Sequence, residues 1–98
     1  MPRIGLLVTQ AGSSRPVDAL GGTTLGSAPT CGIQISEAGV DPRHAIIDHH
    51  EGRWVIGDLG STSGIWLNEA PVFERTVLRV GDRLQLGAAE VRVVRRDG

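Results

Sequence analysis

Three residues of the types that hydrolases use lie within one short stretch of this sequence: His44, Asp58 and Ser61. Nucleophilic catalysis needs a hydroxyl or thiol, a base that accepts its proton and an acid that orients the base. The residue types therefore permit a hydrolase, provided that folding brings these three side chains together. A hydrolase is a minor alternative, and a screen with generic esters would reveal such an activity.

Metal binding is a second chemistry to consider, because three histidines are present. His49 and His50 are adjacent, and His44 lies five positions before His49. Residues five apart in one strand point to opposite faces, so His44 and His49 would not share a metal. Cys31 is the only cysteine, which excludes an internal disulfide and a multi-cysteine zinc site. We expect no metal and no other cofactor, and we expect Cys31 to be a packed, inert thiol.

Glycines at positions 57, 60 and 64 suggest a phosphate-binding loop for a nucleotide. They are followed neither by a Gly-Lys-Ser/Thr ending nor by a helical segment. Gly60 and Gly64 more simply permit the backbone conformations of a bent loop. Nucleotide binding is not supported.

Composition narrows the class further. The chain has 98 residues with 40% hydrophobic and 21% charged residues, which predicts one folded domain, residues 1–98, with a core over about 3–94. Residues 95–98 would be a tail or the start of a linker. A formal net charge of -1 argues against nucleic acid as a partner. Apolar runs are too short for a membrane span, and no signal peptide is evident, so we expect a cytoplasmic protein.

Short segments separated by glycine and proline predict an all-β domain. The chain has 14 glycines and five prolines, and no long window has helical periodicity. Strands this short and numerous favour two packed sheets. Large aromatics in strands are usually core residues, so we expect Trp54 and Trp66 to be buried; an exposed Trp66 would instead indicate an interaction site. We predict strands at 4–9, 16–20, 23–25, 33–35, 44–49, 53–58, 65–67, 84–86 and 90–94.

Four segments, in order, resemble the forkhead-associated (FHA) domain family. They are Thr-Leu-Gly-Ser-Ala-Pro-Thr-Cys-Gly-Ile-Gln-Ile at 24–35, Val-Asp-Pro-Arg-His-Ala-Ile-Ile at 40–47, Asp-Leu-Gly-Ser-Thr-Ser-Gly-Ile-Trp-Leu-Asn at 58–68 and Leu-Arg-Val-Gly-Asp-Arg-Leu-Gln-Leu-Gly at 78–87. The segments cover most of residues 24–87 with compatible intervals. The resemblance implies an FHA/SMAD-like β-sandwich of two mainly antiparallel sheets and about eleven strands.

The same resemblance implies a non-enzymatic module whose loops at one end hold a phosphothreonine peptide. In the family the phosphate contacts come from the arginine after the first glycine, the serine of the Ser-Arg-x-His segment and the asparagine before the glycine of the third segment. Gly26, His44 and Gly64 match positions that support these loops, and the resemblance implies that Ser61 and Asp58 also tie loops together rather than catalyse.

All three phosphate-contacting positions differ in this chain, which carries Ser27, Asp41 and Ser63 instead. Each charge-assisted hydrogen bond to a phosphate is worth about 1.5–3 kcal/mol, and an arginine can make two, against about 8 kcal/mol for a whole micromolar complex. Asp41 adds a like charge near the phosphate position. We therefore expect a protein-interaction or scaffolding module that does not bind phosphothreonine in the usual way.

An alternative keeps phosphothreonine recognition in a rearranged site. Arg43 lies two residues after Asp41 and could supply the cation, with hydroxyls of Ser27, Thr62 and Ser63 as donors. A less specific interpretation has Arg43 pairing with Asp41 or lying in solvent. Under either function the partner is a protein or a peptide, and the candidate peptide-binding residues are Ser27, Asp41, Arg43, Ser61, Thr62 and Ser63.

Overall fold

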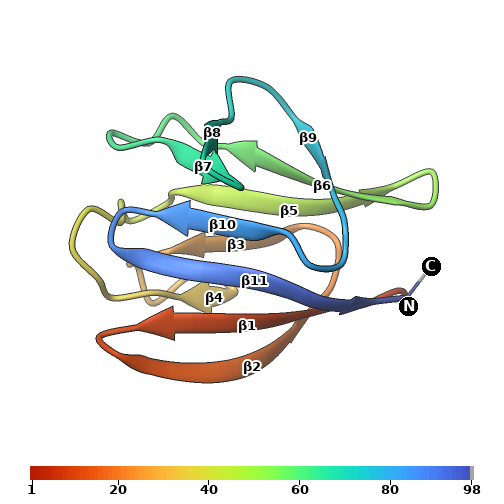
Figure 1. Ribbon diagram of the computed structural model, residues 1–98, viewed down its shortest axis with the longest axis horizontal. Helices are drawn as coiled ribbons and strands as arrows, with labels where there is room; N and C mark the ends of the chain where they lie inside the picture. Colours follow the sequence, from red (N-terminus) through yellow and green to blue (C-terminus); the bar gives the residue numbers. More distant parts are fainter. Residues whose placement is uncertain (98) are drawn as a thin grey trace.

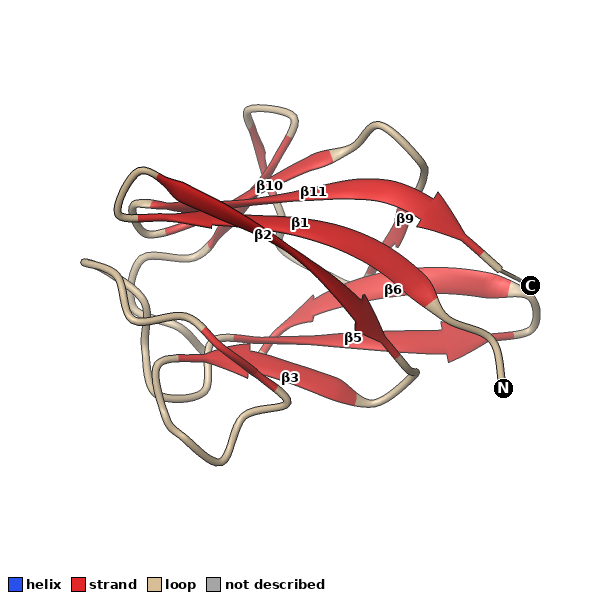
Figure 2. Ribbon diagram, turned by 90° about the horizontal axis from the view of Figure 1, so that it is seen from below, coloured by secondary structure: helices blue, strands red, loops and turns tan. Residues whose placement is uncertain are grey.

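The computed structural model describes residues 1–97, which form two β-sheets packed face to face (Figures 1 and 2). The six-stranded sheet has the order β2 (Ser13–Ala19), β1 (Ile4–Gln10), β11 (Ala89–Arg96), β10 (Arg83–Leu86), β7 (Ile65–Leu67) and β8 (Ala70–Pro71). The five-stranded sheet has the order β4 (Ile33–Gln34), β3 (Thr23–Gly26), β5 (Ala45–His50), β6 (Arg53–Asp58) and β9 (Thr76–Leu78). Among the strands of residues 1–97, only β3 and β4 pair in parallel. The predicted all-β sandwich of mainly antiparallel sheets is confirmed, and the described residues include no helix that could cross a membrane.

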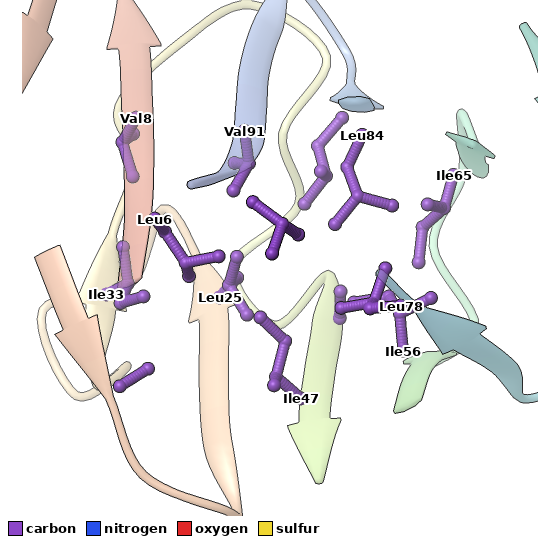
Figure 3. Packing of buried hydrophobic residues seen from close by; sticks show 14 of the residues in the cluster. Leu6, Val8, Leu25, Ile33, Ile47, Ile56, Ile65, Leu78, Leu84 and Val91 are labelled. Carbon is purple, nitrogen blue, oxygen red and sulfur yellow. The ribbon is translucent and has the colours of Figure 1, made fainter. Parts of the chain in front are cut away.

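The core lies between the two sheets and follows from strand alternation. Ile4, Leu6 and Val8 are fully buried at every second position of β1. Figure 3 shows side chains of both sheets meeting there, among them Leu6, Val8, Leu84 and Val91 from one sheet and Leu25, Ile47, Ile56 and Leu78 from the other. This core holds the strands in register and so fixes where their connecting loops emerge.

Several strand boundaries differ from those predicted. The sequence did not indicate β8 or β9, which are only two and three residues long. β2 begins at Ser13 rather than at residue 16, and β11 continues through Arg95 and Arg96, where we had expected a tail. The extra length of β11 follows from its pairing with β1, in which Arg95 lies opposite Gly5 and Arg96 opposite Ile4. The Arg95 guanidinium also forms an ion pair with Asp18 of β2.

Connecting loops gather at one end of the sandwich, and the chain termini lie at the other. The turn between β1 and β2, the loops that flank β4, the β6–β7 loop and the β10–β11 turn gather at one end, while both chain ends lie at the other (Figure 1). The Asp97 N–H donates to the Arg3 carbonyl at 2.8 Å, and Trp54 Nε1 donates to the Asp97 carbonyl at 3.0 Å. Trp54 itself is fully buried, as predicted.

Candidate functional site: the loop cluster and an adjacent groove

Residues 26–32, 36–43 and 59–64 form one cluster of loops, called the loop cluster below, and Gly26 is its tightest point. A Cβ atom at Gly26 would lie 2.2 Å from the carbonyl oxygen of Pro42, well inside van der Waals contact. The chains are this close because the Ser27 N–H donates to the Asp41 carbonyl at 2.9 Å and the Ala28 N–H to the Pro42 carbonyl at 3.1 Å. Only glycine fits at position 26 without moving the backbone.

His44 joins two of the loops from inside the protein. Its side chain is fully buried, and its Nδ1 accepts the Asp41 N–H at 3.1 Å. Nε2 must then carry the proton, which it donates to the Gly64 carbonyl at 2.7 Å. Both ring nitrogens are therefore committed to backbone groups, one in each loop, and the imidazole is a neutral cross-link.

The third loop is folded around Ser61. Its N–H and its hydroxyl donate to the Asp58 carboxylate at 2.8 and 3.1 Å, and the Gly64 N–H donates to the Ser61 Oγ at 3.0 Å. Because the His44 ring bonds backbone groups instead of this hydroxyl, the Ser–His–Asp set permitted by the residue types is not assembled as a catalytic triad.

Asp41 points into the cluster. Its Oδ2 accepts the Thr62 N–H at 2.7 Å, a short, charge-assisted hydrogen bond between two loops. Its main-chain N–H and carbonyl are used as well, by His44 and by Ser27. Among residues 1–97 no ion pair joins Asp41 to Arg43, and Arg43 is exposed, which is the second branch of the expectation that it pairs with Asp41 or lies in solvent.

Further contacts bind the cluster to its neighbours. The Ser63 hydroxyl donates to the Gly39 carbonyl at 2.6 Å, so it is turned toward the protein. Gly39 packs against Gly87 of the β10–β11 turn so closely that a Cβ on Gly87 would lie 2.5 Å from the Gly39 carbonyl carbon. Glu37 accepts the N–H of Ala11 from the β1–β2 turn at 2.5 Å. Five connecting segments at this end of the sandwich are thus tied together.

The remaining candidate groups lie at the surface of the cluster. Arg43 is exposed and has no hydrogen bond or ion pair with any described residue, and the same holds for the hydroxyls of Ser27 and Thr62. The charged side chains of the loop cluster are two carboxylates, Glu37 and Asp41, and one guanidinium, Arg43. An anion would meet one cation and a net negative surrounding.

A groove that the sequence did not indicate runs beside the third loop. It is open to solvent, has a volume of about 290 Å³, and is called the aromatic groove below. Its lining includes Asp58, Thr62, Trp66, Pro71, Val72 and Phe73. Trp66 is 43% exposed and Phe73 is 92% exposed. The expectation of a buried Trp66 is wrong, because β7 turns Ile65 into the core and places the next side chain outside.

The surroundings of His49 and Cys31 indicate packing roles for both residues. The His49 ring lies 4.7 Å from the Trp54 ring, centroid to centroid, at the β5–β6 hairpin. Within residues 1–97 no group of three or more His, Cys, Asp or Glu side chains could hold a metal ion. Cys31 is buried, and its thiol donates to the Pro42 carbonyl at 3.0 Å, which adds another link between two segments of the loop cluster.

Comparison with known sequences gives a family match. The sequence profile described as the FHA domain matches residues 23–87. An FHA domain-containing protein of Arabidopsis thaliana is 40% identical over 50 residues, which are 51% of this chain and 13% of that protein. The oxoglutarate dehydrogenase inhibitor of Corynebacterium efficiens is 35% identical over 65 residues, which are 66% of this chain and 45% of that protein. The matched region thus spans less than half the length of either relative.

Solved structures match over nearly the whole chain. An FHA domain from a study of phosphothreonine-dependent FHA domain interactions has 28% identity and a TM-score of 0.86, with coverage of 98% of this chain and 99% of that one. The FhaA FHA domain, solved in complex with the intracellular domain of a second protein, has 30% identity and a TM-score of 0.82, with coverage of 92% and 98%. The FHA domain of an Arabidopsis thaliana hypothetical protein has 28% identity and a TM-score of 0.82, with coverage of 100% and 91%.

Proposed function

The chain belongs to the FHA domain family, and from this premise we propose that it is a non-enzymatic protein-interaction module that does not read phosphothreonine in the family's usual way. Its partner is a protein or a peptide. The FhaA FHA domain, solved bound to the intracellular domain of a second protein, supports this class of partner. The proposal depends on the three positions at which this chain carries Ser27, Asp41 and Ser63.

One observation carries the proposal: the Asp41 carboxylate accepts the Thr62 N–H at 2.7 Å. A phosphate seated between these loops would approach that carboxylate and the loop donor that it already occupies. Like charges at such range repel, and the N–H could serve the phosphate only by leaving Asp41. The Ser63 hydroxyl is likewise committed, to Gly39. No arginine follows Gly26 to offset these costs.

The loop cluster then has a structural task. Its hydrogen bonds through His44, Asp41 and Ser61 hold the three loops in one arrangement. Such internal satisfaction of donors and acceptors makes a rigid end of the sandwich. A rigid end positions adjacent surface for contact with a partner, because little conformational entropy is lost there on binding.

The test is a titration of one degenerate peptide library in two forms, with phosphothreonine and with threonine at the fixed central position. We expect the two forms to bind this domain with affinities within about threefold of each other, because a phosphate gains no net contact here. The double variant Ser27→Arg/Asp41→Ser should gain phosphate-dependent binding, since it restores a cation and removes the carboxylate. Ser27→Arg alone serves as the control with Asp41 retained.

A second candidate function is phosphothreonine recognition in a rearranged site. It is favoured by Arg43, which is exposed and pairs with no described residue, and by the unpartnered hydroxyls of Ser27 and Thr62. Under this alternative the wild type prefers the phosphorylated library and Arg43→Gln abolishes the preference. If the preference instead disappears in Ser27→Ala and survives Arg43→Gln, the charge argument itself is wrong.

A further inference from the structure

The chain has only three aromatic residues of the Phe, Trp and Tyr types, and two of them are exposed at one place. Trp54 is fully buried, whereas Trp66 is 43% and Phe73 is 92% exposed. Both exposed rings line the aromatic groove. Burial of a phenylalanine side chain is favourable, so the exposed Phe73 forgoes stability that a partner could recover.

Phe73 is held in place rather than at the tip of a loose loop. The preceding residue, Val72, is buried, and its N–H donates to the Ile65 carbonyl at 2.9 Å. Three residues later the chain enters β9 at Thr76. Because Val72 anchors the backbone and turns inward, the ring of Phe73 is presented outward beside Trp66 at a small entropic cost for binding.

The lining of the groove carries a negative charge. Asp58 lines it, and Glu74 follows Phe73 in the chain and is exposed. No arginine lines the groove, and Arg75 is directed to Asp48, 3.7 Å away. The Asp58 oxygens each accept one hydrogen bond from Ser61, which leaves acceptor capacity on a carboxylate. A groove whose lining holds one carboxylate and two exposed aromatic rings suits an apolar anchor with an adjacent cation.

We propose that the aromatic groove binds an extended, unphosphorylated segment of a protein partner in which a bulky apolar side chain lies next to a lysine or arginine. This inference rests on the proposed function and adds to it the contact face and the chemistry of the partner. The apolar side chain packs between Trp66 and Phe73, and the cation meets Asp58 and Glu74. The occupant is identified by charge complementarity and by the two exposed rings.

The experiment uses position-scanning peptides with a fixed central threonine, in threonine and phosphothreonine forms, against the whole chain. We expect the threonine form to select Lys or Arg next to Leu, Ile, Met or Phe. For the best synthetic peptide, Phe73→Ser should weaken binding by about tenfold or more, as for an interface hot spot. Peptide addition should also shift the fluorescence of Trp66 toward the blue, a change that Trp66→Phe removes, because buried Trp54 is far less exposed to the ligand.

Matched variants separate the possible failures. Val80→Ser removes another exposed apolar side chain, 55% accessible and not part of the groove lining, and should leave the affinity unchanged. Glu74→Gln should lower the selection for Lys or Arg without altering the apolar preference. Threonine-form binding that is insensitive to Phe73→Ser would overturn the groove while leaving the proposed function intact. Binding that requires phosphate would overturn the proposed function.

Two further results count against the inference. If no peptide is selected in either form, the groove does not bind such a segment. If the chain instead dimerises in analytical ultracentrifugation, and Phe73→Ser returns it to a monomer, the groove is occupied by a second copy and the peptide partner is excluded.

Discussion

The loop cluster and the aromatic groove share residues of the third loop, but they differ in how their side chains are partnered. In the loop cluster, polar groups from different loops bond one another, as Asp41 does with Thr62 and His44 with Gly64. In the groove, Trp66 and Phe73 remain without apolar cover. The difference indicates that the loop cluster contributes to stability, whereas the groove contributes to contact with a partner. Substitutions in the first region should change unfolding, and substitutions in the second should change binding.

The largest effect on stability is expected from Gly26→Ala. The new Cβ would lie 2.2 Å from the Pro42 carbonyl oxygen, so the backbones at positions 26 and 42 would have to move apart. We expect a loss of about 3 kcal/mol or more in the free energy of unfolding, measured with urea. Gly60→Ala is the control, because it has open space around the Cβ but a φ of +81°, and should cost only about 1–2 kcal/mol. Equal losses in both variants would contradict the steric argument.

His44→Ala should have the next largest effect. It removes a fully buried ring and leaves the Asp41 N–H and the Gly64 carbonyl without their partner. We expect a loss of about 2–3 kcal/mol, from the cavity and the unpaired polar groups together. Amide hydrogen exchange should show faster exchange in both loops that the ring connects. Protection that is unchanged at 36–43 and 59–64 would show that His44 does not hold them.

Asp41→Ala should cost less, about 1 kcal/mol, because the carboxylate is only partly buried and solvent can replace it at the Thr62 N–H. Asp41→Asn retains an oxygen acceptor without the charge and should stay within about 0.5 kcal/mol of the wild type. Urea denaturation of the three proteins measures both differences. A loss in Asp41→Asn as large as that in Asp41→Ala would mean that the charge, rather than the oxygen acceptor, stabilises the loops.

The smallest change in stability is expected from Phe73→Ser, within about 0.5 kcal/mol, because the side chain is 92% exposed. The same variant should show the largest loss of peptide binding. Gly26→Ala should have the largest effect on stability, whereas Phe73→Ser should have the smallest effect on stability and the largest on peptide binding. A marked loss of stability in Phe73→Ser would place the ring in the folded core of the molecule and remove its role as a contact residue.

Much of the scaffold could be predicted from sequence because it is encoded in local patterns. Short segments separated by glycine and proline, together with the lack of helical periodicity, were sufficient for the all-β assignment. β8 and β9 were missed because strands of two and three residues have no pattern of their own, and their pairing with β7 and β6 creates them. In β7 three residues cannot reveal which face is inward, and so Trp66 was assigned to the wrong side.

The motifs indicated which loops to consider but not how their side chains are arranged. The motifs placed Gly26, His44 and Gly64 at the loops, and the structure brings all three into one network. The direction of the Asp41 carboxylate depends on how two loops distant in sequence approach each other, which sequence spacing does not specify. Phe73 was overlooked because it lies between strands too short to recognise. Phe73 is one of only three Phe, Trp or Tyr residues in the chain, and this rarity was the signal in the sequence that could have drawn attention to it.

The opposite placement of the chain ends has a practical consequence for measuring these interactions. Met1 and Asp97 emerge at the far pole from the loop cluster, beside the β5–β6 hairpin (Figure 1). An affinity handle, a fluorophore or a surface tether joined at either end would leave the loop cluster facing the solvent. Immobilised sensor formats are therefore suited to this domain in both orientations, and agreement between the two would itself show that the attachment does not mask the contact face.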